Sequence, residues 1–153
     1  MIKDLLKKEL IVMNLEVAST EKETALKAVS KACSAYSGLD EAKLCEMFLE
    51  REALDSTGFG NHVAIPHAKI MGLKEAFIGI FKFSQSVEWE AIDDEPVKVA
   101  IALVMPGEAE NNTHIQVLSK FSRKLMDDDF IENLLEEENA DRMYDFVLTE
   151  MEG

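Results

Sequence analysis

The sequence predicts one α/β domain, in which a mixed, roughly five-stranded sheet of parallel and antiparallel strands is flanked by helices on both faces. Two stretches, residues 76–83 (AFIGIFKF) and 97–105 (VKVAIALVM), are apolar on both faces, as interior strands are. Segments with apolar residues at helical spacing lie around them. Because strands and helices are interleaved along residues 1–153 with no repeat or linker, we expect a single layered domain.

The predicted first strand is residues 10–17 (LIVMNLEV), which are β-branched and apolar. A helix should follow, because Thr20 and Glu23 have the spacing of a capping box and apolar residues then recur at helical intervals. Gly38 marks its end, since glycine readily adopts the left-handed conformation that closes a helix.

A second helix is expected after Asp40, whose carboxylate can accept hydrogen bonds from the free amides of a first turn. Residues 55–58 have the composition of a turn and should end this helix. Arg51 and Glu52 fall in its last turns. The helix therefore carries a permanently charged guanidinium close in sequence to the glycine-rich segment after it.

The second half of the chain adds one more strand and three helices to the prediction. Residues 87–90 (VEWE) alternate between apolar and polar and predict a short, separate outer strand. Thr113 and Gln116 have the spacing of a second capping box at the start of an amphipathic helix. Further helices are expected near residues 129–138 and 140–150.

Residues 58–69 (GFGNHVAIPHAK) are the most chemically distinctive stretch. The glycines and Asn61 allow turn conformations, and a short apolar run then leads to Pro66. Proline cannot donate to a sheet ladder, so it predicts an edge strand or a strand end. His67 is therefore expected at the end of a rigid element, although a polar surface histidine is the simpler interpretation of this stretch taken alone.

Composition restricts the classes of function. The formal charge is −14 at pH 7, from 16 basic and 30 acidic residues. Most of the acidic excess lies in residues 127–153, which hold eleven acidic side chains and one arginine. Such a field repels nucleic acid and anionic lipid and favours a basic protein partner.

Cysteine use and hydropathy predict a cytoplasmic protein. Cys33 and Cys45 lie in predicted helices without CxxC spacing, and no secretory leader precedes them, so both are expected to be reduced core residues. No apolar run approaches the about 20 residues of a membrane-spanning helix, so no direct membrane insertion is expected.

The three histidines are the candidate reactive groups. The spacing of His62 and His67 argues against a metal site shared by the two. His114 lies in the predicted first turn of a helix, where free amides can hold an anion such as a phosphoryl group, and Arg51 could supply a planar, charged fork for the same group. The plain alternatives are a solvent-facing His114 and an Arg51 in an exposed ion pair.

Several other chemistries lack their motifs. The glycines at positions 58 and 60 are not followed by the Lys-Ser or Lys-Thr of a phosphate-binding loop, and the serine at position 56 lies outside any GxSxG elbow. Residues 127–129 lack the spacing of a calcium loop. These absences argue against an NTPase loop, a serine-hydrolase triad and a calcium loop, and no cofactor is expected in the leading interpretation.

Four separated blocks together resemble one family: Arg51-Glu52 at a helix end, AIPHAK at 64–69, VEWEAID at 87–93 and NNTHIQVL at 111–118. Their order and spacing resemble enzyme IIA of the fructose/mannitol family, the component of the sugar phosphotransferase system that relays phosphate from HPr to enzyme IIB. The resemblance spans residues 10–148 and implies a mixed five-stranded sheet flanked by helices.

The resemblance implies a role for each candidate residue. His67 matches the histidine that accepts the phosphoryl group from phospho-HPr and passes it to enzyme IIB, in most relatives to a cysteine. His114 matches a second active-site histidine and Arg51 an arginine that steadies the phosphoryl group, neither being phosphorylated. His62 departs from the family, where a small residue is common, and its ring is expected to face solvent.

The sequence leaves three functions open. The first is a phosphocarrier in sugar uptake, which the VEWEAID segment favours. The second is a regulatory member of the nitrogen-related branch of the family, in which the phosphorylation state controls partner binding. The third, from another class, is a histidine-metal hydrolase, which would hold zinc.

Overall fold

The structure is a computed structural model that describes residues 2–107 and 111–152, with side chains at 2–107 and 114–152. Within these residues the elements follow in the order α1 (Ile2–Leu5), β1 (Leu6–Leu15), α2 (Lys22–Ser37), α3 (Glu41–Leu54), β2 (Gly58–Gly60), β3 (Val63–Ala64), β4 (His67–Ile70), β5 (Phe77–Val87), β6 (Val97–Pro106), α4 (Asn111–Lys124), α5 (Asp128–Glu136) and α6 (Ala140–Glu152).

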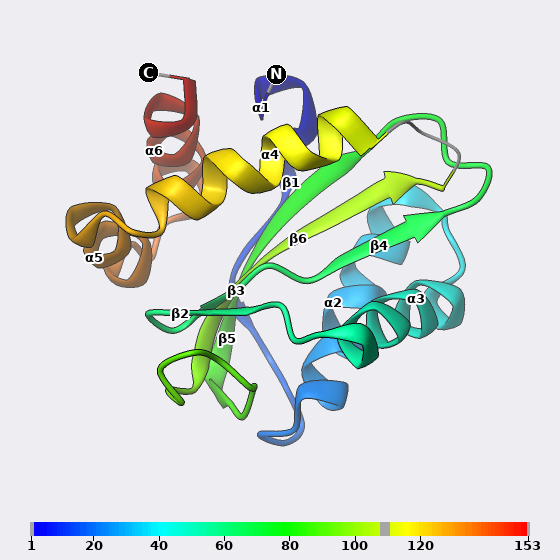
Figure 1. The fold of residues 1–153 in the computed structure, drawn as a ribbon, viewed down its shortest axis with the longest axis horizontal. Coiled ribbons are helices and arrows are strands. Elements are labelled where there is room, and N and C mark those ends of the chain that lie inside the picture. The colour runs from blue at the N-terminus through cyan, green and yellow to red at the C-terminus, as the bar shows by residue number, and fades with distance from the viewer. Residues whose placement is uncertain (1, 108–110, 153) are drawn as a thin grey trace.

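The described strands form one mixed sheet in the order β1-β5-β6-β3-β2, with β4 also paired to β6 (Figure 1). β1 runs parallel to β5, β5 antiparallel to β6, and both β3 and β4 parallel to β6. Because β5 occupies one side of β6, the short strands β3 and β4 follow one another along the other side. The six strands therefore fill about five positions, and the predicted α/β fold is confirmed.

The strand β6 shows why the sheet has helices on both faces. Its side chains at 99, 101 and 103 belong to an apolar cluster shared with α4, α5 and α6, and those at 100, 102 and 104 to a cluster shared with α2 and α3. Figure 1 shows the same division, with α2 and α3 on one side of the sheet and α4 to α6 on the other. The two apolar stretches are interior strands, as predicted.

The helix caps agree only in part with the predictions. Gly38 closes α2 with φ 79°, and the Asp40 carboxylate accepts a hydrogen bond from the Lys43 amide at the start of α3, both as predicted. The capping box at Thr20 is wrong, because α2 begins at Lys22 after an extended Glu21 that provides no side-chain cap. The backbone here is held extended by the hydrogen bond from the Glu88 amide to the Thr20 carbonyl (2.7 Å).

Several predicted boundaries also change. The first strand begins at Leu6, and VEWE is not a separate strand, since β5 continues to Val87 and Glu88 makes only an isolated bridge. A register shift between β5 and β6 accommodates this longer strand. The helix α4 begins at Asn111, before Thr113, and the side chain of the expected capping residue lies outside the described ones.

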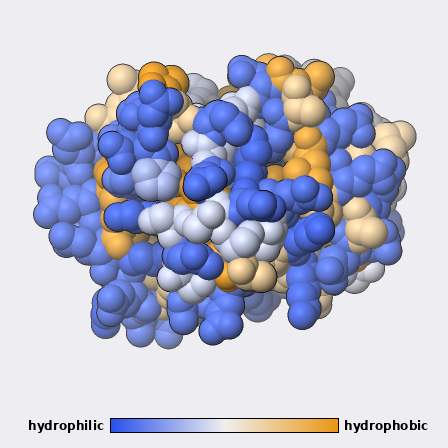
Figure 2. Space-filling view, turned by 90° about the horizontal axis from the view of Figure 1, so that it is seen from below, coloured by the Kyte–Doolittle hydropathy of each residue, from blue (hydrophilic) through white to orange (hydrophobic). Residues whose placement is uncertain are grey.

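The surface shown in Figure 2 is mainly hydrophilic, whereas both cysteines are buried. The face seen in Figure 2 is covered mainly by hydrophilic side chains, in keeping with the high content of charged residues. Cys33 and Cys45 are buried and not joined in a disulfide, as predicted, and burial raises the pKa of the Cys33 thiol to about 12. Among the described helices, none combines the length and apolar character needed to cross a membrane.

Candidate functional site

The segment around Pro66 positions His67 differently from the prediction. The strand β3 stops at Ala64, as a proline two residues later requires, but a new strand begins at His67 itself. In β4, residues 67–70 pair with residues 103–106 of β6, and the Leu103 amide donates to the Pro66 carbonyl (2.9 Å). His67 is therefore the first residue of a short strand at the sheet edge and not the last residue of the preceding one.

The turn before β3 uses left-handed backbone at three successive positions. Gly60, Asn61 and His62 have φ values of 114°, 56° and 68°. The positive φ of His62 is uncommon for a residue other than glycine. Its ring is half-buried and Nδ1 donates to the Pro96 carbonyl (2.8 Å), so the expectation that this ring simply faces solvent is corrected.

Three candidate residues from distant parts of the sequence line one cavity of about 380 Å³. The His67 and His114 ring centroids lie 5.2 Å apart with the planes at 88°, an edge-to-face arrangement. Arg51 contributes to the same cavity from the last turn of α3. The complete lining is Met47, Glu50, Arg51, Leu54, His67, Lys69, His114 and Leu118.

The hydrogen bond at Nδ1 defines the protonation of His67. Only 8% of this residue is exposed, and Nδ1 lies 2.9 Å from the Ile65 carbonyl oxygen. Since a carbonyl only accepts, Nδ1 carries the proton and Nε2 keeps the lone pair in the neutral ring. Burial lowers the pKa of His67, and the charges of Arg51 and Lys69 lower it further, so the ring is neutral near pH 7.

His114 is held uncharged even more strongly. Burial, and then the charges of His67, Lys69 and Arg51, lower its pKa to about 4. Its Nδ1 is buried and has no hydrogen-bond partner among the described residues. His114 lines the cavity, so its neutral ring can contact a group that enters the cavity from outside.

Positive charge at the cavity comes from Arg51 and Lys69. One terminal nitrogen of Arg51 donates to the Asp55 carbonyl (2.6 Å), which holds the guanidinium at the helix end. Sequence reasoning missed Lys69 as a lining residue, although in a strand the side chains at i and i+2 share a face, and this spacing relates it to His67. Glu50 was also missed, and it is the acidic residue of the lining.

These groups together suit transfer of an anionic group. A neutral imidazole with a free lone pair is a nucleophile, and a guanidinium and an ammonium can hold the oxygens of a phosphoryl group. In the described part of the chain, His, Cys, Asp and Glu side chains form no group of three or more that could hold a metal. The helix-start amides expected to assist adjoin residues 108–110, which lie outside the described residues.

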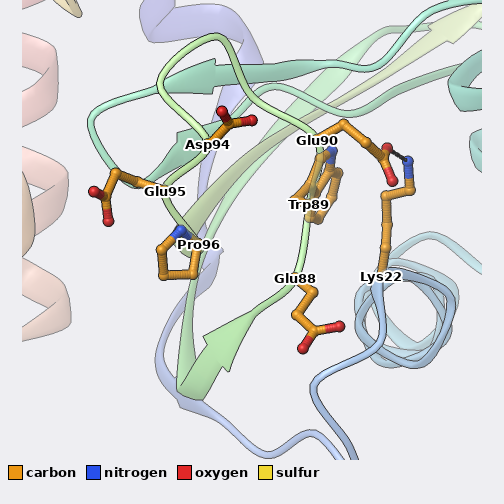
Figure 3. Close-up of a pocket in the computed structure, with 7 residues that line it drawn as sticks. All are labelled: Lys22, Glu88, Trp89, Glu90, Asp94, Glu95 and Pro96. Atoms are coloured by element: carbon orange, nitrogen blue, oxygen red, sulfur yellow. Dashed lines mark hydrogen bonds and ion pairs between the residues drawn. The ribbon is translucent and has the colours of Figure 1, made fainter.

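A second cavity, of about 480 Å³, lies away from the histidines and has a different chemistry. Figure 3 shows its lining, in which Lys22 from α2 points toward the carboxylate of Glu90 and Trp89 lies beside Glu90. The remaining lining residues are Glu88, Asp94, Glu95 and Pro96. The candidate residues His67, His114 and Arg51 are absent from this lining.

The sequence matches a family model over nearly its whole length. The model describes the phosphoenolpyruvate-dependent sugar phosphotransferase system, EIIA 2, and matches residues 4–150. The chain belongs to this family. Members are components of a phosphoryl relay, and the relatives include both sugar-specific EIIA components and nitrogen regulatory proteins.

Three relatives illustrate this range. The fructose-specific EIIABC component of Bacillus subtilis is 32% identical over 147 residues, which cover 95% of this chain and 23% of that protein. The structure of nitrogen regulatory protein IIA-Ntr from Neisseria meningitidis has a TM-score of 0.87 and 30% identity, covering 95% of this chain and 98% of that one.

The third relative is a solved complex of enzyme IIAMTL and phosphorylated enzyme IIBMTL from Escherichia coli. It matches with a TM-score of 0.72 and 20% identity over 97% of this EIIA 2 chain and 99% of that one, which relates the two folds. The resemblance inferred from the four sequence blocks is thereby confirmed at the level of the family.

Proposed function

We propose that this EIIA 2 protein carries a phosphoryl group on Nε2 of His67, received from the phosphohistidine of HPr. The observation that carries the proposal is the edge-to-face pair of His67 and His114 in one cavity with Arg51. The Nε2 lone pair attacks phosphorus while the nitrogen–phosphorus bond of the donor breaks and its electron pair returns to the donor ring. One nitrogen–phosphorus bond replaces another, so the free energy change of the step is small and the transfer is reversible.

The other cavity groups act by holding charge. Arg51 and Lys69 balance the negative phosphoryl oxygens, and a neutral His114 can donate or accept a hydrogen bond beside them without adding a third cation. Catalysis is then mostly a matter of position, since the donor already holds an activated phosphoryl group. No metal, nucleotide or other cofactor takes part in the proposed step.

The next acceptor in the leading proposal is an enzyme IIB of a sugar transport system. The match to a fructose-specific EIIABC component and the family's membership of the sugar phosphotransferase system support this role. The phosphoryl group would leave His67 for the partner, in most relatives for a cysteine, and the histidine would return to its neutral form. The acidic charge of the chain favours a basic docking face on the donor.

A regulatory role is the second candidate. It is favoured by the TM-score of 0.87 to a nitrogen regulatory protein, against 0.72 to the mannitol enzyme in the Escherichia coli complex. The phosphorylation step on His67 would be the same. The two roles differ in the fate of the phosphoprotein, because in regulation the phosphorylated and free forms would bind another protein with different affinity.

Labelling with phosphoenolpyruvate, enzyme I and HPr tests the shared step. The wild-type protein should take up label and His67→Ala should take up none. His62→Ala is the matched control, since His62 bonds to Pro96 and is not part of the cavity lining, and it should label normally. Label on His67→Ala would place the acceptor elsewhere and contradict the proposal.

A second stage separates the two roles. The purified phosphoprotein is challenged with candidate IIB proteins, and loss of label to one of them supports transport. Retention of label with every IIB, together with partner binding that changes on phosphorylation, supports regulation. Zinc analysis of the same preparation tests the hydrolase alternative, which requires bound metal.

A further inference from the structure

Glu52 is a buried carboxylate with an unusually complete set of donors. It lies in the last turn of α3, next to Arg51, and only 7% of it is exposed. Its Oε1 accepts from the Thr57 amide (3.1 Å), Trp89 Nε1 (3.1 Å) and the Lys22 ammonium (3.3 Å), and its Oε2 accepts from the Thr57 hydroxyl. A buried charge is tolerated when it is satisfied in this way, so Glu52 joins several elements at one point.

From Thr57 the hydrogen bonds continue to the ring of His67. The Thr57 carbonyl accepts from the Ile65 amide (3.0 Å), and the Ile65 carbonyl accepts from Nδ1 of His67 (2.9 Å). Each group in this series is held by the one before it. The Ile65 carbonyl sets the protonation of the His67 ring. Its position depends on Thr57, which Glu52 holds in place through hydrogen bonds.

We propose that Glu52 is a positioning residue for His67, which acts through Thr57 and the Ile65 carbonyl to hold the ring in the Nδ1–H form with Nε2 free to attack phosphorus. The consequence for catalysis rests on the proposed function of His67. The consequence for the protonation of the ring does not, because it concerns the unphosphorylated protein alone.

The charge of Glu52 adds a second effect on the same ring. Around His67, Arg51 comes from α3, Lys69 from β4 and His114 from α4, and the two cations lower the pKa of His67 together with burial. The hydrogen bond to the Ile65 carbonyl raises that pKa, and the carboxylate of Glu52 raises it further. Removing the charge of Glu52 should therefore lower the pKa of His67.

Glu90 provides a matched control. Its carboxylate binds the same ammonium, at 2.6 Å from Lys22 Nζ, and Figure 3 shows the two side chains pointing toward one another. The side chain of Glu90 is largely exposed, whereas that of Glu52 is not. No hydrogen bond among the described residues joins the Glu90 carboxylate to Thr57, so Glu90→Gln removes a neighbouring charge and leaves the series to His67 intact.

The experiment compares Glu52→Gln, Thr57→Val and Glu90→Gln with the wild type by nitrogen-15 NMR of the imidazoles across a pH titration. In Glu52→Gln the Nε2–H form of His67 should gain population and the pKa of His67 should fall. Thr57→Val keeps the charge of Glu52 and removes one hydrogen bond. It should therefore raise the population of the Nε2–H form and lower the pKa of His67, each by less than Glu52→Gln does. Glu90→Gln should match the wild type.

Single-turnover transfer from phospho-HPr is measured on the same proteins, and Glu52→Gln should slow it about tenfold through misplacement of the nucleophile. A folded Glu52→Gln with wild-type ring protonation and pKa overturns the proposal. If Glu52→Gln does not fold, Thr57→Val decides, and unchanged ring protonation there overturns it equally. Failure of His67 to accept label would contradict the proposed function while the NMR result stands by itself.

Discussion

The imidazole rings of His67 and His114 lie 5.2 Å apart and almost perpendicular, one at the start of β4 and the other in the first turn of α4. Two charged rings at this distance would repel each other strongly. Both pKa values are lowered, first by burial, so the pair is neutral near pH 7. The site therefore combines a nucleophilic ring with positive charge that comes from Arg51 and Lys69.

Replacing His114 should separate acceptance from donation of the phosphoryl group. We expect His114→Ala to accept label from phospho-HPr and to pass it to enzyme IIB about tenfold more slowly, because a hydrogen-bonding group beside the transferred oxygens is lost. Rapid-quench transfer assays measure the two steps separately. A rate of transfer to IIB equal to that of the wild type would remove the proposed role of His114.

The lowered pKa of His114 predicts how stability depends on pH. The unfolded ring takes up a proton near its ordinary pKa of about 6.5, whereas the folded ring does so only near a pKa of about 4. The unfolded state therefore binds more protons between these values, and the free energy of unfolding should fall as the pH drops from 7 to 5. His67 contributes in the same direction.

Urea unfolding at pH 7, 6 and 5 measures this dependence. His114→Gln should lose less stability over the same range, because the titrating ring is gone. The range stays above the ordinary pKa of carboxylates, so acid titration of aspartate and glutamate contributes little to the comparison. An identical slope in the wild type and in His114→Gln would contradict the assignment of the shift to burial of this ring.

Arg51 is expected to act through its planar fork as well as its charge. Arg51→Lys keeps the positive charge but loses the paired donors, and we expect phosphoryl transfer to slow by about tenfold, a difference of about 1.4 kcal/mol. Arg123→Lys is the control, because Arg123 lies in the last turn of α4, away from His114 in the first turn, and this variant should have wild-type rates. Equal rates for all three proteins would show that a point charge is sufficient at position 51.

Gly58 should not tolerate a side chain, because Glu90 and Trp89 leave no room for a Cβ atom. An added Cβ would collide with the carbonyl oxygen of Glu90 and lie 3.1 Å from Cδ1 of Trp89. We expect Gly58→Ala to lower the free energy of unfolding by about 2–3 kcal/mol, as overpacking against backbone does. At Gly38, φ is 79° and a Cβ would meet nothing within 4 Å, so Gly38→Ala should cost only about 1 kcal/mol. Thermal or chemical unfolding of both variants provides the comparison.

Local patterns predicted most of the fold because they report local physics. The apolar stretches became β5 and β6, and Asp40 and Gly38 cap helices as expected. The errors lie where distant segments compete with the local pattern. The capping box at Thr20 failed because its backbone pairs with Glu88, and residues 88–90 left the sheet although their alternation resembles a strand.

The sequence by itself determined the alternation of strands and helices, the acidic charge, the family blocks and the three residues His67, His114 and Arg51 as candidates. Only the tertiary structure decided that they share a cavity, because α3 and α4 pack on opposite faces of the sheet and meet at the edge formed by β4. The hydrogen bonds that link Glu52 to His67 through Thr57 and Ile65 were likewise not predictable from the sequence. Periodicity records which side chains are buried and where the chain turns, whereas the distance between remote residues depends on how the whole core packs.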